Sequence, residues 1–520
     1  MLCSTPFLQS LAEQFAQHLR ASFPAEEVEA AAARVSDAPE FGPWAQRYFA
    51  KYFTVAPSSF HLWFDDELGR FHRTRNQRLN VLAPRGSAKT TRLLAYVVYC
   101  VCHKIEPYIV LTSDTSDQAE KYLDTIKTEL EENDLLIQDY PHVAGKGGVW
   151  RSDAIESRNG IRIEALSTGR KIRGRKHRQY RPSLIVVDDP QNLDHIVSEL
   201  QRGRSMSWLK HDVCNAGDPG TNILVAGTAL HEDCIVCQLQ KLWPSRLFRS
   251  IEQWPDRMDL WREWELRYLD LDDRDREATA REYYERHRAE MDAGAVVMWP
   301  ARMDLYALML KRIEIGPAAF NFEYQNHPVN PAVQEWPETY FDRSDMWFDV
   351  WPALETLTVR ALALDPSKGR KDKKSDYSAF VRLGRAADGR IYVEADMARR
   401  DTAAIVSDAV RHCEEFRPDV FALETNSWQD LLQAPIEQEA VNRGVPLPIR
   451  PVVNTVHKAV RIRRLTPDLH QGRFRFRRNP ATQLLVQQMR DFPAGAHDDG
   501  PDALEMARRA AVEFFNASMT

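Results

Sequence analysis

The 520-residue sequence predicts an α/β protein built from two successive domains, each with a sheet covered by helices. Short apolar runs alternate with longer helical patterns, which is typical of strands joined by helices. The alternation stops in a stretch with prolines at positions 328, 331, 337 and 352, and then resumes. The chain is also too long for one hydrophobic core, which rarely exceeds about 300 residues.

The first half contains five expected strands, each a short apolar run. These runs are 79–83, 108–112, 161–165, 184–188 and 222–226. Helical patterns at 92–104 and 116–133 separate the first of them. Because strands joined by helices lie parallel and are buried on both faces, we expect a parallel sheet with helices on both sides.

The second half repeats the alternation. Strands are expected at 358–364, 378–383, 391–395 and 420–423, and helices at 402–416, 428–443 and from about 501 onward. We therefore expect a helical segment at 1–50, a first α/β domain at 51–330, a linker at 331–355 and a second α/β domain at 356–520.

Composition excludes several classes of protein. Hydrophobic residues make up 43% and charged residues 28%, which is ordinary for a globular chain and unlike a disordered or fibrous one. The longest apolar stretch, 93–102, is too short to span a bilayer, and the N-terminus has no leader pattern. Seven scattered cysteines suit a reducing cytoplasm. The net charge of −6 leaves room only for a local basic surface.

A phosphate-binding loop is expected between the first strand and the helix that follows, in Ala83-Pro-Arg-Gly-Ser-Ala-Lys-Thr-Thr91. A phosphate chain needs backbone N–H groups, a helix N-terminus, one cation and a hydroxyl for magnesium. Lys89 supplies the cation, Thr90 the hydroxyl, and Gly86 lets the backbone approach closely. Ala83 and Ala88 stand where the usual motif has glycine. The expected nucleotide contacts in the loop are Arg85, Gly86, Ser87, Ala88, Lys89, Thr90 and Thr91.

Two carboxylates complete this site at the end of the run Leu184-Ile-Val-Val-Asp-Asp-Pro190. Magnesium prefers oxygen ligands, so Asp188 is assigned to the ion together with Thr90. Asp189 is expected to orient or deprotonate the attacking water, a position more often filled by glutamate. The competing interpretation is a turn, for which Asp-Asp-Pro is a good sequence.

Carboxylates also follow the strands of the second half. Asp365 ends its first strand, Glu424 ends a later one, and Asp498, Asp499 and Asp502 lie at the start of the final helix. Carboxylates that converge from separate elements can hold two metal ions about 4 Å apart, as phosphodiester cleavage requires. Each residue alone is more often a turn or helix-start residue. Asp499 is favoured among the three aspartates, but the choice stays open.

Two basic segments are candidates for contact with nucleic-acid phosphates. They are Lys458-Ala-Val-Arg-Ile-Arg-Arg464 and Gly472-Arg-Phe-Arg-Phe-Arg-Arg478. In the second, arginine alternates with phenylalanine, as on a strand with one basic face. Solvated arginine is the competing interpretation, and any phosphate contact would be independent of base sequence.

The order of these motifs resembles that of phage terminase large subunits, from about residue 50 to 515. The loop Pro84-Arg-Gly-Ser-Ala-Lys-Thr90 is similar to the family's deviant phosphate loop. Gly169-Arg-Lys-Ile-Arg-Gly-Arg175, followed by Arg181-Pro-Ser, resembles its approach to the second ATPase motif. The segment Val225-Ala-Gly-Thr228 resembles its coupling motif, in which Thr228 would sense the γ-phosphate.

The resemblance implies a P-loop NTPase domain at 51–330 and an RNase-H-like nuclease domain at 356–520. It implies ATP-driven translocation of double-stranded DNA into a viral procapsid, and cleavage of concatemeric DNA by a Mg²⁺- or Mn²⁺-dependent endonuclease. The nuclease pattern carries over to Asp365, Glu424 and the segment His497-Asp-Asp499.

The implied partners are double-stranded DNA, a portal protein, a small terminase subunit and further copies of this chain in a ring, with a monomer in solution left open. The implied location is the host cytoplasm, with transient docking on the procapsid, no place in the mature virion and no membrane. Two alternatives stay open: a translocase or helicase whose nuclease-like domain is inactive, and a non-enzymatic prophage remnant that binds nucleotide without turnover.

Overall fold

The computed structural model describes residues 38–196, 198–328, 335–366, 377–425, 430–495 and 497–519. They form two compact units. The first comprises the described residues up to Gln253, together with Val296–Leu308 and those of Asn321–Val329. The second comprises Trp254–Ala295, Met309–Phe320 and the described residues from 335 onward. No helix in the described part of the chain is long and apolar enough to cross a membrane.

The division into two compact units differs from the predicted domain limits. It does not test those limits, which stay a prediction. Trp254–Ala295 groups with the second unit, although it lies inside the expected first domain. Within the expected linker, β11 (Trp347–Phe348) joins the sheet of the second unit. Most of the expected N-terminal helical segment lies outside the described residues.

The first unit is built on an eight-stranded sheet with the order β3-β4-β5-β2-β6-β7-β1-β8. Its strands are β1 (Arg78–Leu82), β2 (Tyr108–Ser113), β3 (Val149–Trp150), β4 (Ala154–Glu156), β5 (Arg162–Ser167), β6 (Leu184–Asp188), β7 (Asn222–Gly227) and β8 (Ser245–Leu247). The six strands from β5 to β8 in this order are parallel, and β3 and β4 are antiparallel additions at one edge. The five strands expected from the sequence are β1, β2, β5, β6 and β7, so the predicted parallel sheet is confirmed.

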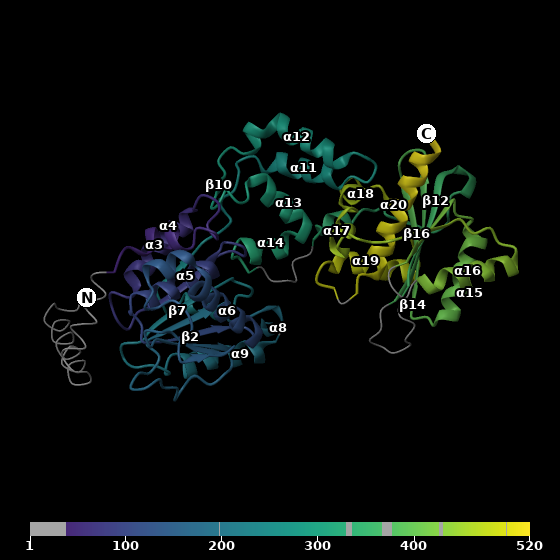
Figure 1. Cartoon of the computed structure of the whole chain (residues 1–520). Helices are drawn as coiled ribbons and strands as arrows, with labels where there is room; N and C mark the ends of the chain where they lie inside the picture. Colours follow the sequence, from purple (N-terminus) through teal and green to yellow (C-terminus); the bar gives the residue numbers. More distant parts are fainter. Residues whose placement is uncertain are drawn as a thin grey trace, which may run out of the picture. The chain divides into compact units, whose positions relative to one another are not determined.

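Helices cover both faces of this sheet (Figure 1). Alternate side chains of each strand enter different cores, as the two-residue period of a strand requires. Val81 and Val186 pack with α3 (Phe41–Tyr48), α4 (Ser59–Phe71), α5 (Lys89–Cys102) and α6 (Ser116–Glu132). Leu82 and Val187 pack on the opposite face with α9 (Glu199–Trp208), the π-helix η1 (Leu209–Val213) and α10 (Ile235–Leu239). The smaller elements of this unit are α7 (Asp134–Asp139), α8 (Leu193–Ile196), β9 (Ile251–Gln253) and β10 (Val296–Val297).

The second unit is built on a seven-stranded mixed sheet with the order β11-β17-β14-β13-β12-β15-β16. Its strands besides β11 are β12 (Leu357–Asp365), β13 (Ser378–Ala386), β14 (Ile391–Ala398), β15 (Val420–Glu424), β16 (Ile449–Val452) and β17 (Phe474–Arg477). The first three form an antiparallel meander, and β15 and β16 then add in parallel on the far side of β12. This is the predicted RNase-H-like arrangement, which is confirmed.

Helices also cover both faces of the second sheet. The final helix α20 (Asp499–Met519) places Ala503 and Ala507 against the small side chains Ala361 and Ala363 of β12, which allows close packing. The helices α15 (Thr402–Phe416) and α16 (Asp430–Arg443) cover the other face. Further helices of this unit are α17 (Lys458–Arg463), α18 (Thr466–His470) and α19 (Pro480–Asp491), and Glu338–Tyr340 and Leu354–Thr356 form 3₁₀ turns.

A helical pair, α11 (Met258–Leu269) and α12 (Arg276–Met291), belongs to the second unit. Asp272, between the two helices, lies 2.5 Å from Arg473 and 2.9 Å from the buried Arg508. These ion pairs explain why the segment groups with the second sheet. The chain changes unit within each of the helices α13 (Leu305–Ile315) and α14 (Pro317–Tyr324).

Candidate nucleotide site and acidic centre

The loop between β1 and α5 has the backbone shape of an anion-binding cradle. Gly86 and Ala88 both adopt left-handed conformations, with φ of 74° and 59°. No side chain caps the N-terminus of α5, so its first N–H groups are left for an outside acceptor. The buried Ser87 hydroxyl has no hydrogen-bond partner among the described residues. These features fit a bound phosphate chain, as the sequence predicts.

Lys89 is the buried cation of this cradle. Its Nζ lies 2.9 Å from Asp189 Oδ2 and donates to Thr228 Oγ1 at 3.3 Å. Burial opposes the charged form, but Asp189 and Asp188 outweigh it and raise the pKa of Lys89. The lysine is therefore a cation at neutral pH, held where phosphate oxygens would be bound.

Thr90 and Asp188 meet as predicted, although they are separated by 98 positions. The Thr90 hydroxyl donates to Asp188 Oδ2 at 2.5 Å. The second carboxylate oxygen, Oδ1, is buried and has no hydrogen-bond partner in the described part of the chain. Burial, followed by the charge of Asp189, raises the pKa of Asp188 to about 7. A hydroxyl beside a carboxylate with an unpaired oxygen fits magnesium, which takes oxygen ligands.

The sheet order places Thr228 between the two halves of the site. Strand β7 lies between β1 and β6, and Thr228 follows its last residue. Its hydroxyl also approaches Ala83 O at 3.3 Å, so it contacts both the loop backbone and Lys89. Asp189 adopts a left-handed conformation with φ of 43°, which is unusual for a residue other than glycine and is often found at functional sites.

Arg85 points away from the expected phosphates in this structure. Its side chain is 69% exposed and pairs with Glu323 of α14 at 2.9 Å, and its N–H donates to Glu323 O at 2.8 Å. Thr91 lines, together with Thr90 and with Tyr122 of α6, a cavity of about 250 Å³ beside the loop. The predicted contact of Arg85 with nucleotide therefore requires its side chain to turn.

His61 of α4 supports the loop and was not predicted from the sequence. Ser58 N donates to its Nδ1 at 3.0 Å, so the proton lies on Nε2, which donates to Ser87 O at 2.7 Å. Burial lowers the pKa of His61 to about 4, so the ring is neutral at physiological pH. Only the fold brings this histidine to the loop, 26 residues further along the chain.

The second unit gathers the predicted carboxylates at one end of its sheet. Asp365 and Glu424 end the parallel neighbours β12 and β15, where Leu364 pairs with Leu423. Asp499 and Asp502 lie in the first turn of α20, and all four side chains are buried. Burial raises the pKa of Asp365 well above its usual range, and Asp502, Glu424 and Asp499 contribute through their charges.

Lys458 of α17 lies among these carboxylates. Its Nζ is 2.9 Å from Asp498, 3.6 Å from Asp365 and Asp502, and 3.7 Å from Asp499. Burial opposes its charge, but the carboxylates raise the pKa of Lys458. The sequence indicated only a basic surface at this position. The structure places the lysine at the centre of the acidic cluster.

The carboxylates differ in how they are compensated. Asp502 accepts two bonds from Arg461 Nη2, at 2.6 and 2.7 Å. Glu424 accepts from Asn454 Nδ2 at 3.0 Å, and Asp499 accepts from Tyr377 N at 3.1 Å. Asp502 thus has its own buried cation, which suits a structural role more than a metal ligand.

The donor chemistry of this acidic centre suits a hard divalent cation, because only carboxylate oxygens from three elements converge. The spacing does not yet suit one. Within the described ranges, no group of three or more His, Cys, Asp or Glu side chains is arranged to hold a metal ion. Lys458 lies at the point where the carboxylates meet.

The alternating arginines of β17 have carboxylate partners. Arg473 lies 2.5 Å from Asp272, Arg475 lies 2.5 Å from Asp345, and Arg477 lies 2.7 Å from Glu394. The phenylalanines between them are buried. The charges of the three arginines are therefore compensated within the second unit.

Over most of its length the chain is similar to solved structures of large terminases. The HK97 bacteriophage large terminase is 14% identical, with 88% of this chain and 95% of that chain covered and a TM-score of 0.32. The large terminase from a thermophilic bacteriophage, in complex with ATP-gamma-S, is 10% identical, with coverages of 88% and 99% and a TM-score of 0.34. Thermus thermophilus RuvC is 12% identical, with coverages of 31% and 96% and a TM-score of 0.20. These likenesses concern the fold alone. No family model and no curated protein matches the sequence.

Proposed function

We propose that this chain is the large subunit of a DNA-packaging terminase, an ATP-driven motor joined to a DNA-cutting unit. The observation that carries the proposal is the cradle around Lys89, in which an uncapped helix, a buried cation and the pair Thr90–Asp188 meet. The acidic centre on an RNase-H-like sheet, and the terminase-like order of motifs along the chain, support the second half of the proposal.

In the motor unit, Lys89 and the free N–H groups of α5 would bind the β- and γ-phosphates of ATP. Thr90 and Asp188 would hold Mg²⁺, which would neutralise phosphate charge. In the structure, Asp189 and Lys89 are paired. Phosphate oxygens would compete for the lysine and leave Asp189 to accept a proton from the attacking water. Thr228, which contacts Lys89, would respond to loss of the γ-phosphate.

In the nuclease unit, Asp365, Glu424 and Asp499 would hold a divalent cation, Mg²⁺ or Mn²⁺, which would polarise the scissile phosphate. Asp498 lies at the rim, 2.9 Å from Lys458, and would share this role or pair with the lysine. Asp502 would orient Arg461 and support the packing beneath the centre. Lys458 would balance the carboxylate charge and bind a phosphate oxygen of DNA.

The proposed substrate is double-stranded DNA, packaged into a procapsid and cut from a concatemer. The proposed partners are a portal protein, a small terminase subunit and further copies of this chain in a ring. The proposed location is the host cytoplasm, with transient docking on the procapsid. The predicted terminase family rests here on the motif order and the two sites.

Paired assays on one purified protein test the proposal. Lys89→Ala should abolish ATP hydrolysis and leave metal-dependent plasmid nicking intact, because the two sites share no residue. Asp365→Asn should do the reverse. Loss of such a group removes several kcal/mol of transition-state stabilisation, which either assay detects easily. Survival of ATP hydrolysis in Lys89→Ala would show that the cradle is not the nucleotide site.

One observation favours a second candidate, a translocase whose nuclease-like unit is inactive. Lys458 lies where the carboxylates converge, and no described group has metal spacing. Titration of Mg²⁺ and Mn²⁺ against plasmid cleavage separates the two: a cutting enzyme responds to metal, and the inactive unit does not. Steady-state phosphate release excludes or supports the non-enzymatic alternative.

A further inference from the structure

The connection between β5 and β6 is the most basic segment of the motor unit. Between Gly169 and Arg181 it carries seven lysines and arginines in 13 residues, although the whole chain has a net charge of −6. It lies on the face of the sheet that also carries α9, because Ile172 is fully buried in the core beneath that helix. We name this face, with α9 and η1, the basic face.

Most cations of the segment lack a carboxylate partner. Three of its arginines form ion pairs, with Glu164, Glu156 and Asp218. The other four cations are exposed and form no ion pair with any described residue: Arg170, Lys171, Arg173 and Lys176. Arg204 of α9 and Lys210 of η1 are also exposed and without such a partner in the described ranges. The arginines of β17, by contrast, are each compensated by an acid.

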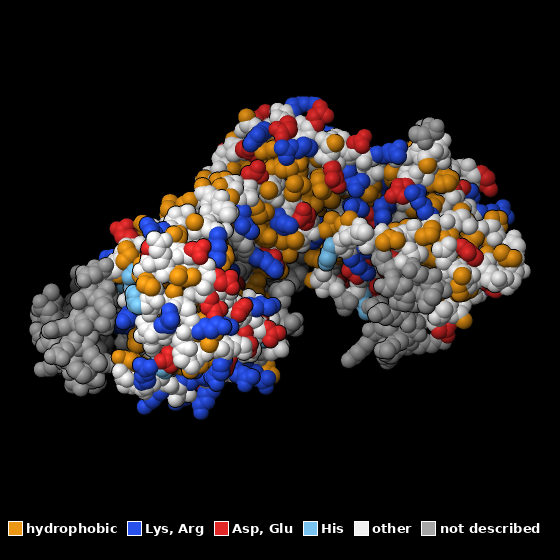
Figure 2. Space-filling view, in the orientation of Figure 1, with side chains coloured by type: hydrophobic (Ala, Val, Ile, Leu, Met, Phe, Trp, Pro, Cys, Tyr) orange, Lys and Arg blue, Asp and Glu red, His pale blue; other side chains and the backbone are white. Residues whose placement is uncertain are grey.

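The backbone of the segment is fixed while its cations face solvent. Trp208 Nε1 donates to Arg170 O at 2.8 Å, and Ile172 anchors the next turn in the core. Gly169 and Gly174 turn the chain with φ of 84° and 82°. Lys and Arg side chains gather along the lower edge of the first unit, around α9 (Figure 2). A preordered backbone reduces the entropy lost when the cations meet a ligand.

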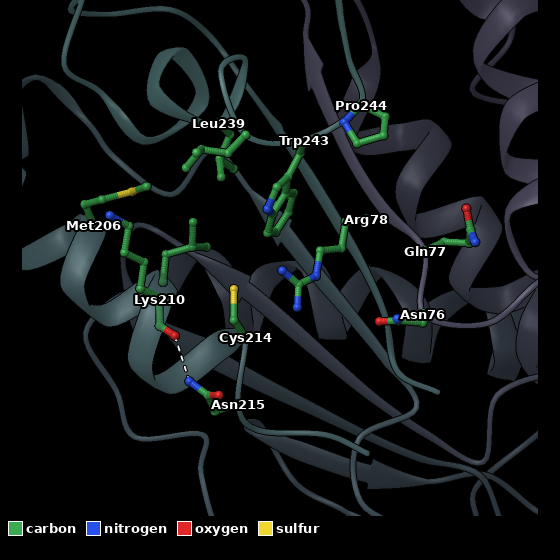
Figure 3. A pocket seen from close by; sticks show the side chains of 12 residues that line it. Asn76, Gln77, Arg78, Met206, Lys210, Cys214, Asn215, Leu239, Trp243 and Pro244 are labelled. Atoms are coloured by element: carbon green, nitrogen blue, oxygen red, sulfur yellow. Dashed lines mark hydrogen bonds between the residues drawn. The ribbon is translucent and has the colours of Figure 1, made fainter. Parts of the chain in front are cut away.

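The same face continues into an open cavity of about 740 Å³ (Figure 3). Lys210 lines it, and across from η1 the Arg78 guanidinium lies 5.5 Å from the Trp243 ring centroid. A π-helix such as η1 is uncommon and is often found at functional positions. The cavity adds a further exposed cation, Arg78, to the basic face.

We propose that the basic face binds the phosphate backbone of duplex DNA, independently of base sequence, and is the surface by which the motor unit holds its substrate. Uncompensated cations on a fixed surface match the regular row of phosphates along a duplex. The proposal rests on the proposed function, because it names the DNA-binding surface of that motor.

The basic segment begins next to the nucleotide site. Thr168 precedes it, and its hydroxyl donates to Pro190 O at 2.8 Å while its N–H donates to Ser113 O at 2.7 Å. Pro190 follows Asp189, the residue paired with Lys89. Thr168 and Pro190 therefore connect the basic segment to Asp189, the proposed water-activating carboxylate. We expect DNA bound to the segment to change the rate of ATP hydrolysis through this connection.

The test uses the full chain and a fluorescent DNA duplex, measured by anisotropy in EDTA so that no cleavage occurs. The variant Arg170→Gln/Lys171→Gln/Arg173→Gln/Lys176→Gln removes the four unpaired cations. The control, Arg47→Gln/Arg73→Gln/Lys104→Gln/Lys146→Gln, removes the same number of exposed cations from the α3–α6 side of the same unit; two of these, Arg47 and Lys146, pair with Asp139 and Glu131. The dissociation constant is measured over a salt series for the unaltered chain and both variants.

Each phosphate contact contributes a slope of about −0.9 to log K against log salt, so the first variant should reduce the slope by about 3 to 4 and the control should not. Equal slopes in the two variants overturn the proposal. The proposal is also overturned if the fourfold variant binds DNA normally but no longer self-associates in sedimentation. That result would show that the basic face contacts another copy of the chain. If the fourfold variant melts early, the double variants Arg170→Gln/Lys171→Gln and Arg173→Gln/Lys176→Gln replace it. Each should reduce the salt slope by about half as much as the fourfold variant would.

Basal ATP hydrolysis without DNA distinguishes failure of this inference from failure of the proposed function. An unaltered chain that hydrolyses no ATP contradicts the motor, whatever the anisotropy shows. A fourfold variant with normal basal hydrolysis, weak DNA binding and no stimulation by DNA supports the inference. A variant that binds DNA normally but loses basal hydrolysis refutes it and assigns the segment to nucleotide chemistry.

Discussion

Replacing Arg461 by methionine should lower the free energy of unfolding of the second unit by about 3 kcal/mol, because it leaves a buried carboxylate without its cation. Arg461 is 5% exposed and Asp502 is 2% exposed, and Arg461 Nη2 lies 2.6 and 2.7 Å from the two carboxylate oxygens. Lys458, 3.6 Å from Asp502, is shared with three other carboxylates and compensates it only in part.

Calorimetry of the full chain measures this effect. At about 2 to 4 °C per kcal/mol for a unit of this size, the transition of the second unit should fall by roughly 6 to 12 °C. The matched control is Arg450→Met, which breaks an ion pair with Glu513 whose side chains are 51% and 45% exposed. That change should cost less than about 1 kcal/mol.

A double variant tests whether the unpaired Asp502 carboxylate causes the loss of stability. Arg461→Met/Asp502→Leu removes both charges and should recover most of the lost stability, because a buried ion pair can often be replaced by apolar side chains. The interpretation is refuted if Arg461→Met shifts the transition no more than Arg450→Met does. It is also refuted if the double variant is less stable than the single one.

Three further predictions follow from the described contacts. Gly86 and Ala88 both have positive φ, which glycine adopts more easily than alanine. Ala88→Gly should therefore keep ATP hydrolysis and raise the stability of the first unit slightly, whereas Gly86→Ala should lower that stability by about 1 kcal/mol. Thermal melting should show the two variants shifting the melting temperature in opposite directions. Burial lowers the pKa of His61 from 6.5 to about 4, so between these pH values the histidine is protonated in the unfolded chain but not in the folded one. The first unit should therefore lose stability as the pH falls from 6.5 to 4. His61→Gln should make the stability depend less on pH in calorimetric scans. Lys458→Met should make the second unit's melting temperature rise more steeply with added Mg²⁺ than in the unaltered chain, and an absence of any Mg²⁺ effect in both would contradict metal binding there.

The parts of the molecule that follow local rules could be predicted from the sequence. The cradle is one continuous segment, and its partner Asp188 ends a strand of the same parallel sheet, so the carboxyl ends of two strands had to meet. Asp365 and Glu424 follow the same rule on the second sheet. Strand order, which places β7 between β1 and β6, was not accessible from the pattern of residues alone.

The residues that sequence reasoning missed depend on packing between distant segments. Lys458 belongs to a run of basic residues that is typical of a solvated surface, yet α17 packs on α20 and brings it to the carboxylates. Glu323 and His61 reach the phosphate loop only through the fold. In β17 the alternation of arginine and phenylalanine indicated a strand correctly, but acids contributed by other segments compensate its charges.

The two sites solve one electrostatic problem in opposite ways. Each gathers two or more carboxylates around a single lysine, and a charge that is removed from water is stable only when it is paired. If the first site binds nucleotide as proposed, the ligand is an anion, and phosphate would displace Asp189 from Lys89 and leave the Asp189 carboxylate to act on water. If the acidic centre binds a divalent cation as proposed, that cation would displace Lys458 from the carboxylates, and the lysine would then be available to bind a DNA phosphate. Under the proposed function, each lysine–carboxylate pair would therefore hold a group that the chemistry uses, Asp189 in the first site and Lys458 in the second, until the ligand displaces it.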